Sequence, residues 1–138
     1  MLLPAAVLLL WTIGVMAWMF IDRGRAFRAH DIDLARTAPG TRGSDLASVL
    51  PAGSDWPAHN YAHLMEQPTV FYPAVVMLSL ISAAGFDIAL AWIYVVLRIG
   101  HSVWQITVNT IAVRAGIFLA YSLVLAILVI RVLLALLT

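Results

Sequence analysis

Four long apolar segments dominate the hydrophobic pattern along the chain. Residues 2–21 and 67–86 contain no acidic or basic side chain, and further apolar segments cover 88–106 and 112–137. About twenty apolar residues in a helix cross a hydrocarbon core of roughly 30 Å. The pattern therefore predicts an all-α integral membrane protein, a single domain over 1–138 with four transmembrane helices at about 2–21, 58–85, 88–106 and 112–137.

The first apolar segment is predicted to be a retained helix rather than a cleaved signal peptide. A signal peptide carries its basic residues before an apolar core of about 7–15 residues. Here Arg23, Arg25 and Arg28 follow the segment, and no basic residue precedes it.

Prolines and glycines mark the boundaries of the other segments. The second helix is predicted to begin near Pro57, because the missing N–H of a proline costs nothing in a first turn. Pro68 and Pro73 are expected to bend that helix. Residues 85–87, Gly-Phe-Asp, are predicted to form a tight turn. The connection at 22–57 is rich in glycine and proline, so it is expected to be largely irregular, with a short helical turn at 31–36.

The composition agrees with a membrane protein and excludes several other classes. Hydrophobic residues make up 63% of the chain and charged residues 11%, whereas soluble domains are near half apolar and a quarter charged. The formal net charge is only +1 and all eight basic residues are arginine, so no nucleic-acid partner is expected. The absence of cysteine from the sequence excludes disulfides and cysteine-ligated metals.

The distribution of arginine predicts the orientation in the membrane. Five of the eight arginines lie within 22–57 and Arg114 flanks the connection between the third and fourth helices. The connection between the second and third helices carries no basic residue. Because arginine is enriched on the cytoplasmic side, we expect the 22–57 loop to be cytoplasmic. Both termini would then be periplasmic if the membrane is a bacterial inner membrane.

Polar side chains recur at one depth of three of the predicted helices, at spacings of three and four residues that place each set on one helical face. These sets are His59, His63 and Glu66, then Arg98, His101 and Gln105, and finally Arg114, Phe118 and Tyr121. Ionisable groups inside membrane helices usually face a partner, a cavity or a site. A shared polar site at the cytoplasmic half of the bundle is therefore predicted.

Structural roles for the same side chains stay open at this stage. Glu66 and Arg98 are the right types for a buried ion pair between the second and third helices. His101 suits a hydrogen-bonded packing role. Arg131 is expected to extend to the opposite membrane surface. Four tryptophans are expected to lie at membrane interfaces or to face lipid: Trp11, Trp18, Trp92 and Trp104.

Two kinds of chemistry fit the polar sets. Arginine side chains can hold the carboxylates of an anionic ligand in bidentate geometry, and a nearby arginine favours a thiolate over a thiol. Alternatively, His59, His63 and Glu66, with His101 nearby, have types and spacings that zinc or iron accepts.

Two segments resemble the helix signatures of a known family. Residues 61–72, Tyr-Ala-His-Leu-Met-Glu-Gln-Pro-Thr-Val-Phe-Tyr, and residues 92–102, Trp-Ile-Tyr-Val-Val-Leu-Arg-Ile-Gly-His-Ser, are similar to those of the MAPEG superfamily. That name covers membrane-associated proteins in eicosanoid and glutathione metabolism. Asn109 and Arg114 also stand where bacterial members tend to have them, so the resemblance is closest to that type.

The resemblance implies a homotrimer that binds glutathione, as thiol cosubstrate, between neighbouring protomers on the cytoplasmic side. It implies transfer of the thiol to lipophilic electrophiles that enter from lipid, or reduction of peroxides. It places Arg114 at the catalytic position that stabilises the thiolate. The implied glutathione-binding positions are His59, His63, Glu66, Arg98, His101 and Gln105.

Several of these positions depart from the family pattern. His63 stands where asparagine is usual, and His59 where enzymatic members have arginine. Gln105 replaces a tyrosine, while Ala115 and Phe118 replace the serine and tyrosine of some members. Two hypotheses therefore remain: a glutathione-dependent transferase or peroxidase, and a non-catalytic scaffold that binds lipid or another anionic small molecule.

Overall fold

The computed structural model describes residues 1–32, 36–43, 45, 50–51, 53–81 and 84–137. Its helices are α1 (Leu2–Ala29), α2 (Trp56–Leu64), α3 (Pro68–Ile81), α4 (Gly85–Thr107) and α5 (Ile111–Leu137). Taking α2 and α3 together, four of them are long and apolar enough to cross a membrane. No strand occurs within the described ranges. The prediction of an all-α membrane protein with four spans is confirmed.

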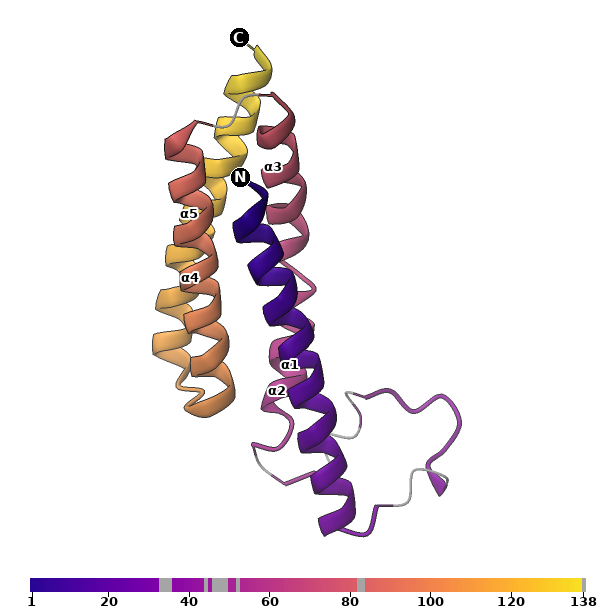
Figure 1. The fold of residues 1–138 in the computed structure, drawn as a ribbon. Coiled ribbons are helices and arrows are strands. Elements are labelled where there is room, and N and C mark those ends of the chain that lie inside the picture. Colours follow the sequence, from indigo (N-terminus) through magenta and orange to yellow (C-terminus); the bar gives the residue numbers. More distant parts are fainter. Residues whose placement is uncertain (33–35, 44, 46–49, 52, 82–83, 138) are drawn as a thin grey trace.

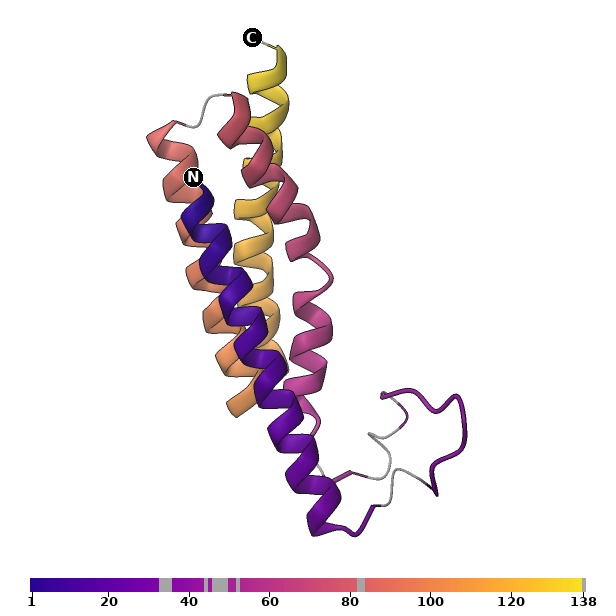
Figure 2. The same ribbon diagram turned by 45° about the vertical axis from the view of Figure 1, so that its right-hand side comes forward.

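The helices form an elongated bundle in which both termini lie at one end (Figures 1 and 2). The segment that follows α1 lies at the opposite end, together with the turn between α4 and α5. Helix α4 packs against α5 and α1, α3 packs against α5, and α2 packs against α1 and α4. This arrangement surrounds α4 with α1, α2 and α5 near the loop end of the bundle.

Helix α1 continues well past residue 21, where the sequence predicted its end, and stops at Ala29. Charged residues mark where a helix leaves the hydrocarbon, but they do not terminate it. Its 28 residues span about 42 Å, which is more than a roughly 30 Å hydrocarbon core. The helix ends where Asp31 takes a left-handed backbone conformation (φ 51°) and Ile32 donates its N–H to the Phe27 carbonyl at 3.0 Å. Of the helical turn predicted for 31–36, residues 33–35 lie outside the described ranges.

The predicted second helix is interrupted rather than bent at Pro68. Helix α2 ends at Leu64, residues 65–67 form a turn, and α3 begins at Pro68 itself. A proline lacks the N–H that would continue the helical hydrogen bonds, and it disfavours helical geometry in the residue before it. Pro73 lies inside α3 without ending it. Gln67 crosses to α5, donating to the Ser122 hydroxyl at 2.7 Å.

Residues 85–87 form the first turn of α4, not the separate tight turn that the sequence predicted. The Asp87 carboxylate accepts the backbone N–H of Ala84 at 3.0 Å, which satisfies one of the free donors of a helix start. The same carboxylate is fully buried and accepts from Arg131 Nε of α5 at 2.8 Å. Arg131 therefore pairs with a buried carboxylate at this end of the bundle, while its extension to the membrane surface stays a prediction.

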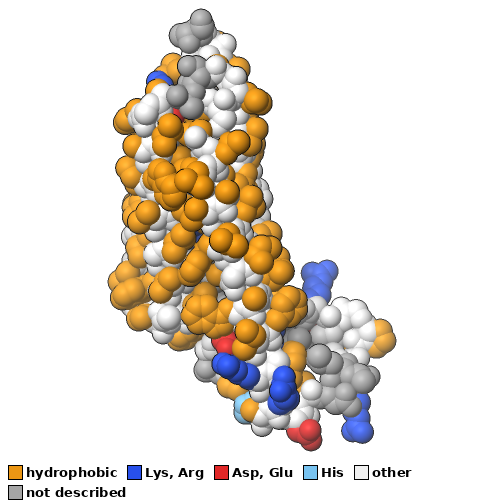
Figure 3. All heavy atoms as spheres, in the orientation of Figure 1, with side chains coloured by type: hydrophobic (Ala, Val, Ile, Leu, Met, Phe, Trp, Pro, Cys, Tyr) orange, Lys and Arg blue, Asp and Glu red, His pale blue; other side chains and the backbone are white. Residues whose placement is uncertain are grey.

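The core consists of aliphatic and aromatic side chains between the helices. Phe71 of α3 stacks on Tyr94 of α4 with ring centroids 4.3 Å apart, and Tyr94 meets the edge of Tyr121 of α5 at 5.7 Å. Leu8 and Leu128 are also fully buried. Hydrophobic side chains cover the length of the bundle on the face shown in Figure 3, while most charged side chains on that face gather at the loop end. This division matches a lipid-embedded bundle with one strongly polar end.

Replacing Asp87 with alanine is expected to lower the melting temperature by roughly 5 °C or more. The change leaves the Arg131 guanidinium without its carboxylate and removes an acceptor from the start of α4. Unfolding in detergent can be followed by tryptophan fluorescence. The control is Asp22→Ala, which removes a partly exposed carboxylate at the other end of the bundle and should change stability little. Equal losses in the two variants would contradict a stabilising role for the Asp87–Arg131 pair.

Candidate functional site

Helix α4 places its polar side chains on the face that it buries. Arg98, His101 and Gln105 are spaced by three and four residues, and all three lie on the inner face of the bundle. Arg98 is 0% exposed, His101 2% and Gln105 5%. The spacing predicted from the sequence therefore gathers these side chains on one buried face, next to α2 and α5.

The Arg98 guanidinium contacts imidazoles rather than a carboxylate. Its Nη1 lies 3.2 Å from Nδ1 of His101, and its Nη2 lies 3.5 Å from Nδ1 of His63. Its central carbon lies 5.5 Å from the centre of the Tyr121 ring, a distance at which a ring face attracts a cation. Among the described residues, no acidic side chain forms an ion pair with Arg98, and Nε has no hydrogen-bond partner.

Glu66 does not form the interhelical ion pair with Arg98 that the sequence allowed. Helix α2 ends before Glu66, so this residue lies in the turn ahead of Pro68. Its side chain is 69% exposed, and its carboxylate lies 3.7 Å from Nε2 of His63. Glu66 therefore borders the polar site from outside.

Arg114 approaches the site from the start of α5. The turn before it contains Asn109 in a left-handed conformation (φ 59°), which asparagine tolerates better than most residues. The Arg114 guanidinium donates to the Asn109 side-chain oxygen. This hydrogen bond ties the arginine to the α4–α5 turn and leaves its other donors available.

A cavity of about 220 Å³ lies between α2, α4 and α5. Its lining residues are His63, His101, Ile111, Arg114, Ala115 and Phe118. The Phe118 ring stacks on His63 with centroids 5.7 Å apart, and the rings of His63 and His101 lie 5.3 Å apart. The structure thus brings three of the predicted site residues to one cavity and places Arg98 directly behind two of them.

The cavity combines hydrogen-bond donors with an apolar wall. Its polar lining is a guanidinium and two imidazoles, while Ile111, Ala115 and Phe118 supply hydrocarbon surface. A carboxylate, thiolate or other acceptor suits the first part, and an apolar group suits the second. The sequence identified Arg114 and the histidines by type and spacing, whereas the Ile111 wall carried no signal beyond its hydrophobicity.

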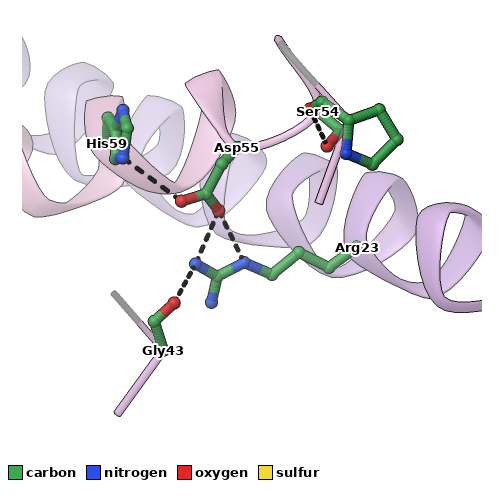
Figure 4. A network of polar contacts seen from close by, with 6 residues as sticks. Arg23, Gly43, Ser54, Asp55 and His59 are labelled. Carbon is green, nitrogen blue, oxygen red and sulfur yellow. Dashed lines mark hydrogen bonds and ion pairs between the residues drawn. The ribbon is translucent and has the colours of Figure 1, made fainter. Parts of the chain in front are cut away.

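His59, one helical turn before His63 on α2, does not line this cavity. Its Nε2 lies 3.2 Å from the Asp55 carboxylate, and Asp55 also accepts from Nε and Nη2 of Arg23 at 3.0 and 2.6 Å (Figure 4). Arg23 donates in addition to the Gly43 carbonyl at 3.0 Å. These side chains border a separate cavity of about 320 Å³ between α1, α2 and the loop. Asp55 is buried and lies one helical turn before His59, so its carboxylate is within reach of the His59 ring.

A polar network that the sequence did not reveal ties three helices together. The Ser102 hydroxyl of α4 accepts from Trp11 Nε1 of α1 at 2.9 Å and from the Asn60 side chain of α2. Trp11 was expected to be an interfacial or lipid-facing residue, but its indole N–H faces the bundle. No sequence pattern identifies this partnership, because it depends on how three helices pack.

The metal alternative gains no geometric support. Among the residues that the structure describes, no group of three His, Cys, Asp or Glu side chains is placed to hold a metal ion. His59 is directed to Asp55, and the Nδ1 atoms of His63 and His101 face Arg98. The side chains proposed as ligands are therefore divided between two networks.

Comparison with known proteins identifies one family. No curated protein matches the chain, and no solved structure matches it. The model of the MAPEG family matches residues 1–134, which is nearly the whole chain. The match includes the first three spans, most of the fourth, the His63–Arg98–His101 contacts and Arg114. The chain therefore belongs to the MAPEG family.

Proposed function

We propose that this membrane protein is a glutathione-dependent transferase or peroxidase that acts on lipophilic electrophiles. The observation that carries the proposal is the cavity between α2, α4 and α5, with Arg114 and two histidines on its wall, in a chain of the MAPEG family. Glutathione is a tripeptide with two carboxylates and one thiol. The donors of the cavity fit its acceptors, and the apolar wall fits a hydrophobic second substrate.

Arg114 has the catalytic role in this proposal. A guanidinium beside a thiol stabilises the thiolate, which is the nucleophilic form. In a transfer reaction the thiolate sulfur forms a bond to the electrophilic carbon, and the leaving group departs with the bonding electron pair. In a peroxidase reaction two glutathione thiols are oxidised to the disulfide while the peroxide is reduced to an alcohol and water. The Asn109 hydrogen bond holds Arg114 at the edge of the cavity in either case.

The cavity size supports a site that a neighbouring protomer completes. One chain offers about 220 Å³, whereas pockets for drug-sized ligands are roughly 300–1,000 Å³. A tripeptide would extend beyond the single protomer. We therefore include a homotrimer in the proposal, with each glutathione between two protomers.

The remaining predicted site residues have unequal support. Arg98 and Gln105 are buried beside the cavity, and Glu66 is at its border. His59 borders a different cavity. In the proposed trimer, it would therefore contact only a glutathione molecule that is held in the cavity of a neighbouring protomer. If glutathione fails to bind, the alternative is a scaffold of the same fold that binds lipid or another anionic small molecule.

Millimolar reduced glutathione is expected to raise the melting temperature of the purified protein in detergent by several degrees. A ligand at a hundredfold excess over its Kd stabilises the native state by about 2.7 kcal/mol. The shift should be lost in Arg114→Ala, which removes a cationic donor from the cavity. It should persist in Arg28→Ala, which changes an exposed arginine in the last turn of α1.

Turnover of a chromogenic electrophile by the same variants completes this test. Equal turnover in wild type and Arg114→Ala would contradict the catalytic role of Arg114. The absence of any shift or turnover in wild type would favour the non-catalytic alternative.

The mass of the detergent-solubilised protein should be three times the 15.1 kDa of one protomer. Native mass spectrometry removes the detergent contribution and measures this directly. A monomer or dimer under conditions that preserve folding would contradict the trimer.

We also propose that the protein lies in a bacterial inner membrane with the 22–57 loop in the cytoplasm and both termini in the periplasm. The chain has no cysteine, so a single introduced cysteine can report its side of the membrane. Arg42→Cys should react with an impermeant maleimide only in inside-out vesicles. Phe86→Cys, at the exposed start of α4, should react only from the periplasmic side. The reverse labelling pattern would invert the proposed orientation.

A further inference from the structure

Arg98 lies within hydrogen-bonding distance of both cavity histidines, His63 and His101. Arg98 reaches His101 at 3.2 Å and His63 at 3.5 Å, and in each case the imidazole atom facing it is Nδ1. The two contacts use different guanidinium nitrogens, Nη1 and Nη2. One buried side chain therefore contacts the Nδ1 atoms of two separate imidazoles.

A guanidinium can only donate hydrogen bonds, and it stays protonated in proteins. An imidazole nitrogen that faces it must therefore be an acceptor without a proton. A neutral imidazole carries its single proton on the other nitrogen. Nδ1 of His63 and Nδ1 of His101 thus accept from Arg98, and the ring proton of each lies on Nε2.

From this geometry we infer that Arg98 is a positioning residue that fixes both cavity histidines as Nε2–H donors. Arg98 itself is fully buried and is absent from the cavity lining, whereas His63 and His101 are part of it. Arg98 acts on a ligand through the two rings and makes no contact with it.

The packing around the rings keeps these donors in place. His63 lies against Phe118 with ring centroids 5.7 Å apart, and His101 meets the Tyr121 ring edge-on at 5.5 Å. The Tyr121 ring also lies 5.5 Å from the Arg98 guanidinium carbon. These contacts fix the plane of each ring, and a ring that turned over within that plane to present Nδ1 to the cavity would lose its hydrogen bond to Arg98.

The consequence is a polar wall in which every polar group of the cavity lining donates. These groups are the two Nε2–H groups and the Arg114 guanidinium, and none of them can accept a hydrogen bond in this state. The Glu66 carboxylate, outside this lining, lies 3.7 Å from His63 Nε2 and competes with a ligand for that donor, while His101 Nε2–H and Arg114 remain for the ligand. Such a wall selects an anionic acceptor, in particular a carboxylate, over an amide or ammonium. This selectivity rests on the proposed glutathione function, whereas the protonation pattern of the two rings does not.

The protonation pattern can be measured without any ligand by nitrogen-15 NMR of histidine- and arginine-labelled protein. The four histidines of the chain can be assigned by single substitutions. In wild type, His63 and His101 are expected to show a protonated Nε2, an unprotonated Nδ1, and a coupling across the hydrogen bond from Arg98 Nη1 to His101 Nδ1. A protonated Nδ1 in either residue would overturn the inference.

The variant Arg98→Met removes the donors while keeping an unbranched apolar side chain. His101 is expected to change to a mixture of both tautomers, while the exposed His30 keeps its wild-type spectrum. Wild-type tautomers in a folded Arg98→Met protein would contradict the positioning role. If this variant does not fold, the Arg98–His101 coupling in wild type decides the question, its presence supporting the inference and its absence overturning it.

Ligand selectivity is tested separately by melting experiments with glutathione and its diethyl ester, which lacks both carboxylates. If glutathione raises the melting temperature of the wild type at least twice as much as the diester does, the result would support selection of carboxylates by the polar wall. Equal increases would contradict it. If neither compound shifts the melting temperature, the proposed function fails, while the NMR result still decides the role of Arg98.

Discussion

The burial of the Arg98 guanidinium is the constraint around which the loop end of the bundle is organised. A charge inside a low-dielectric bundle is costly unless polar groups surround it. Here the partners come from three helices: His101 from α4, His63 from α2 and the Tyr121 ring from α5. The positions of α2 and α5 relative to α4 are therefore tied to one side chain. The same contacts form the inner wall of the cavity, so the stability of this region and the chemistry of the site have a common source.

Polar contacts at three depths connect helices whose outer surfaces are mostly hydrocarbon. Apolar side chains gain little by leaving lipid, so hydrogen bonds and close packing contribute much of the association between membrane helices. Asp87 and Arg131 join α4 to α5 near the termini, and Ser102 joins α4 to both α1 and α2 deeper in the bundle. At the loop end, Arg23 and Asp55 join α1 to the start of α2 and hold the Gly43 carbonyl of the loop. Each contact connects a different pair or set of helices, which fixes their relative rotation.

The sequence predicted the features that depend on one segment at a time. Span number and approximate position follow from length and hydrophobicity, and the polar face of α4 follows from its spacing of three and four residues. The sequence placed the end of α1 too early, because the membrane boundary and the end of a helix are different features. The first charged residue after an apolar segment marks the membrane boundary, whereas α1 ends only at Ala29, where its backbone changes conformation. The sequence did not identify the polar partners of Arg98, Arg131 or His59, because these depend on side chains from other helices or on a neighbouring turn.

Residues that depart from the family pattern redistribute polarity within the cavity rather than abolish it. His63 supplies a ring that can both hydrogen-bond to Arg98 and stack on Phe118, two contacts that a shorter amide side chain cannot make together. Ala115 leaves the space beside Arg114 free of a further polar group. The donors therefore gather on the α2–α4 side and at Arg114, while the remaining α5 surface is apolar. An amphipathic ligand would orient with its anionic groups toward the histidines and its apolar part along α5, which places a hydrophobic substrate of the proposed reaction on the side of Ile111 and Phe118.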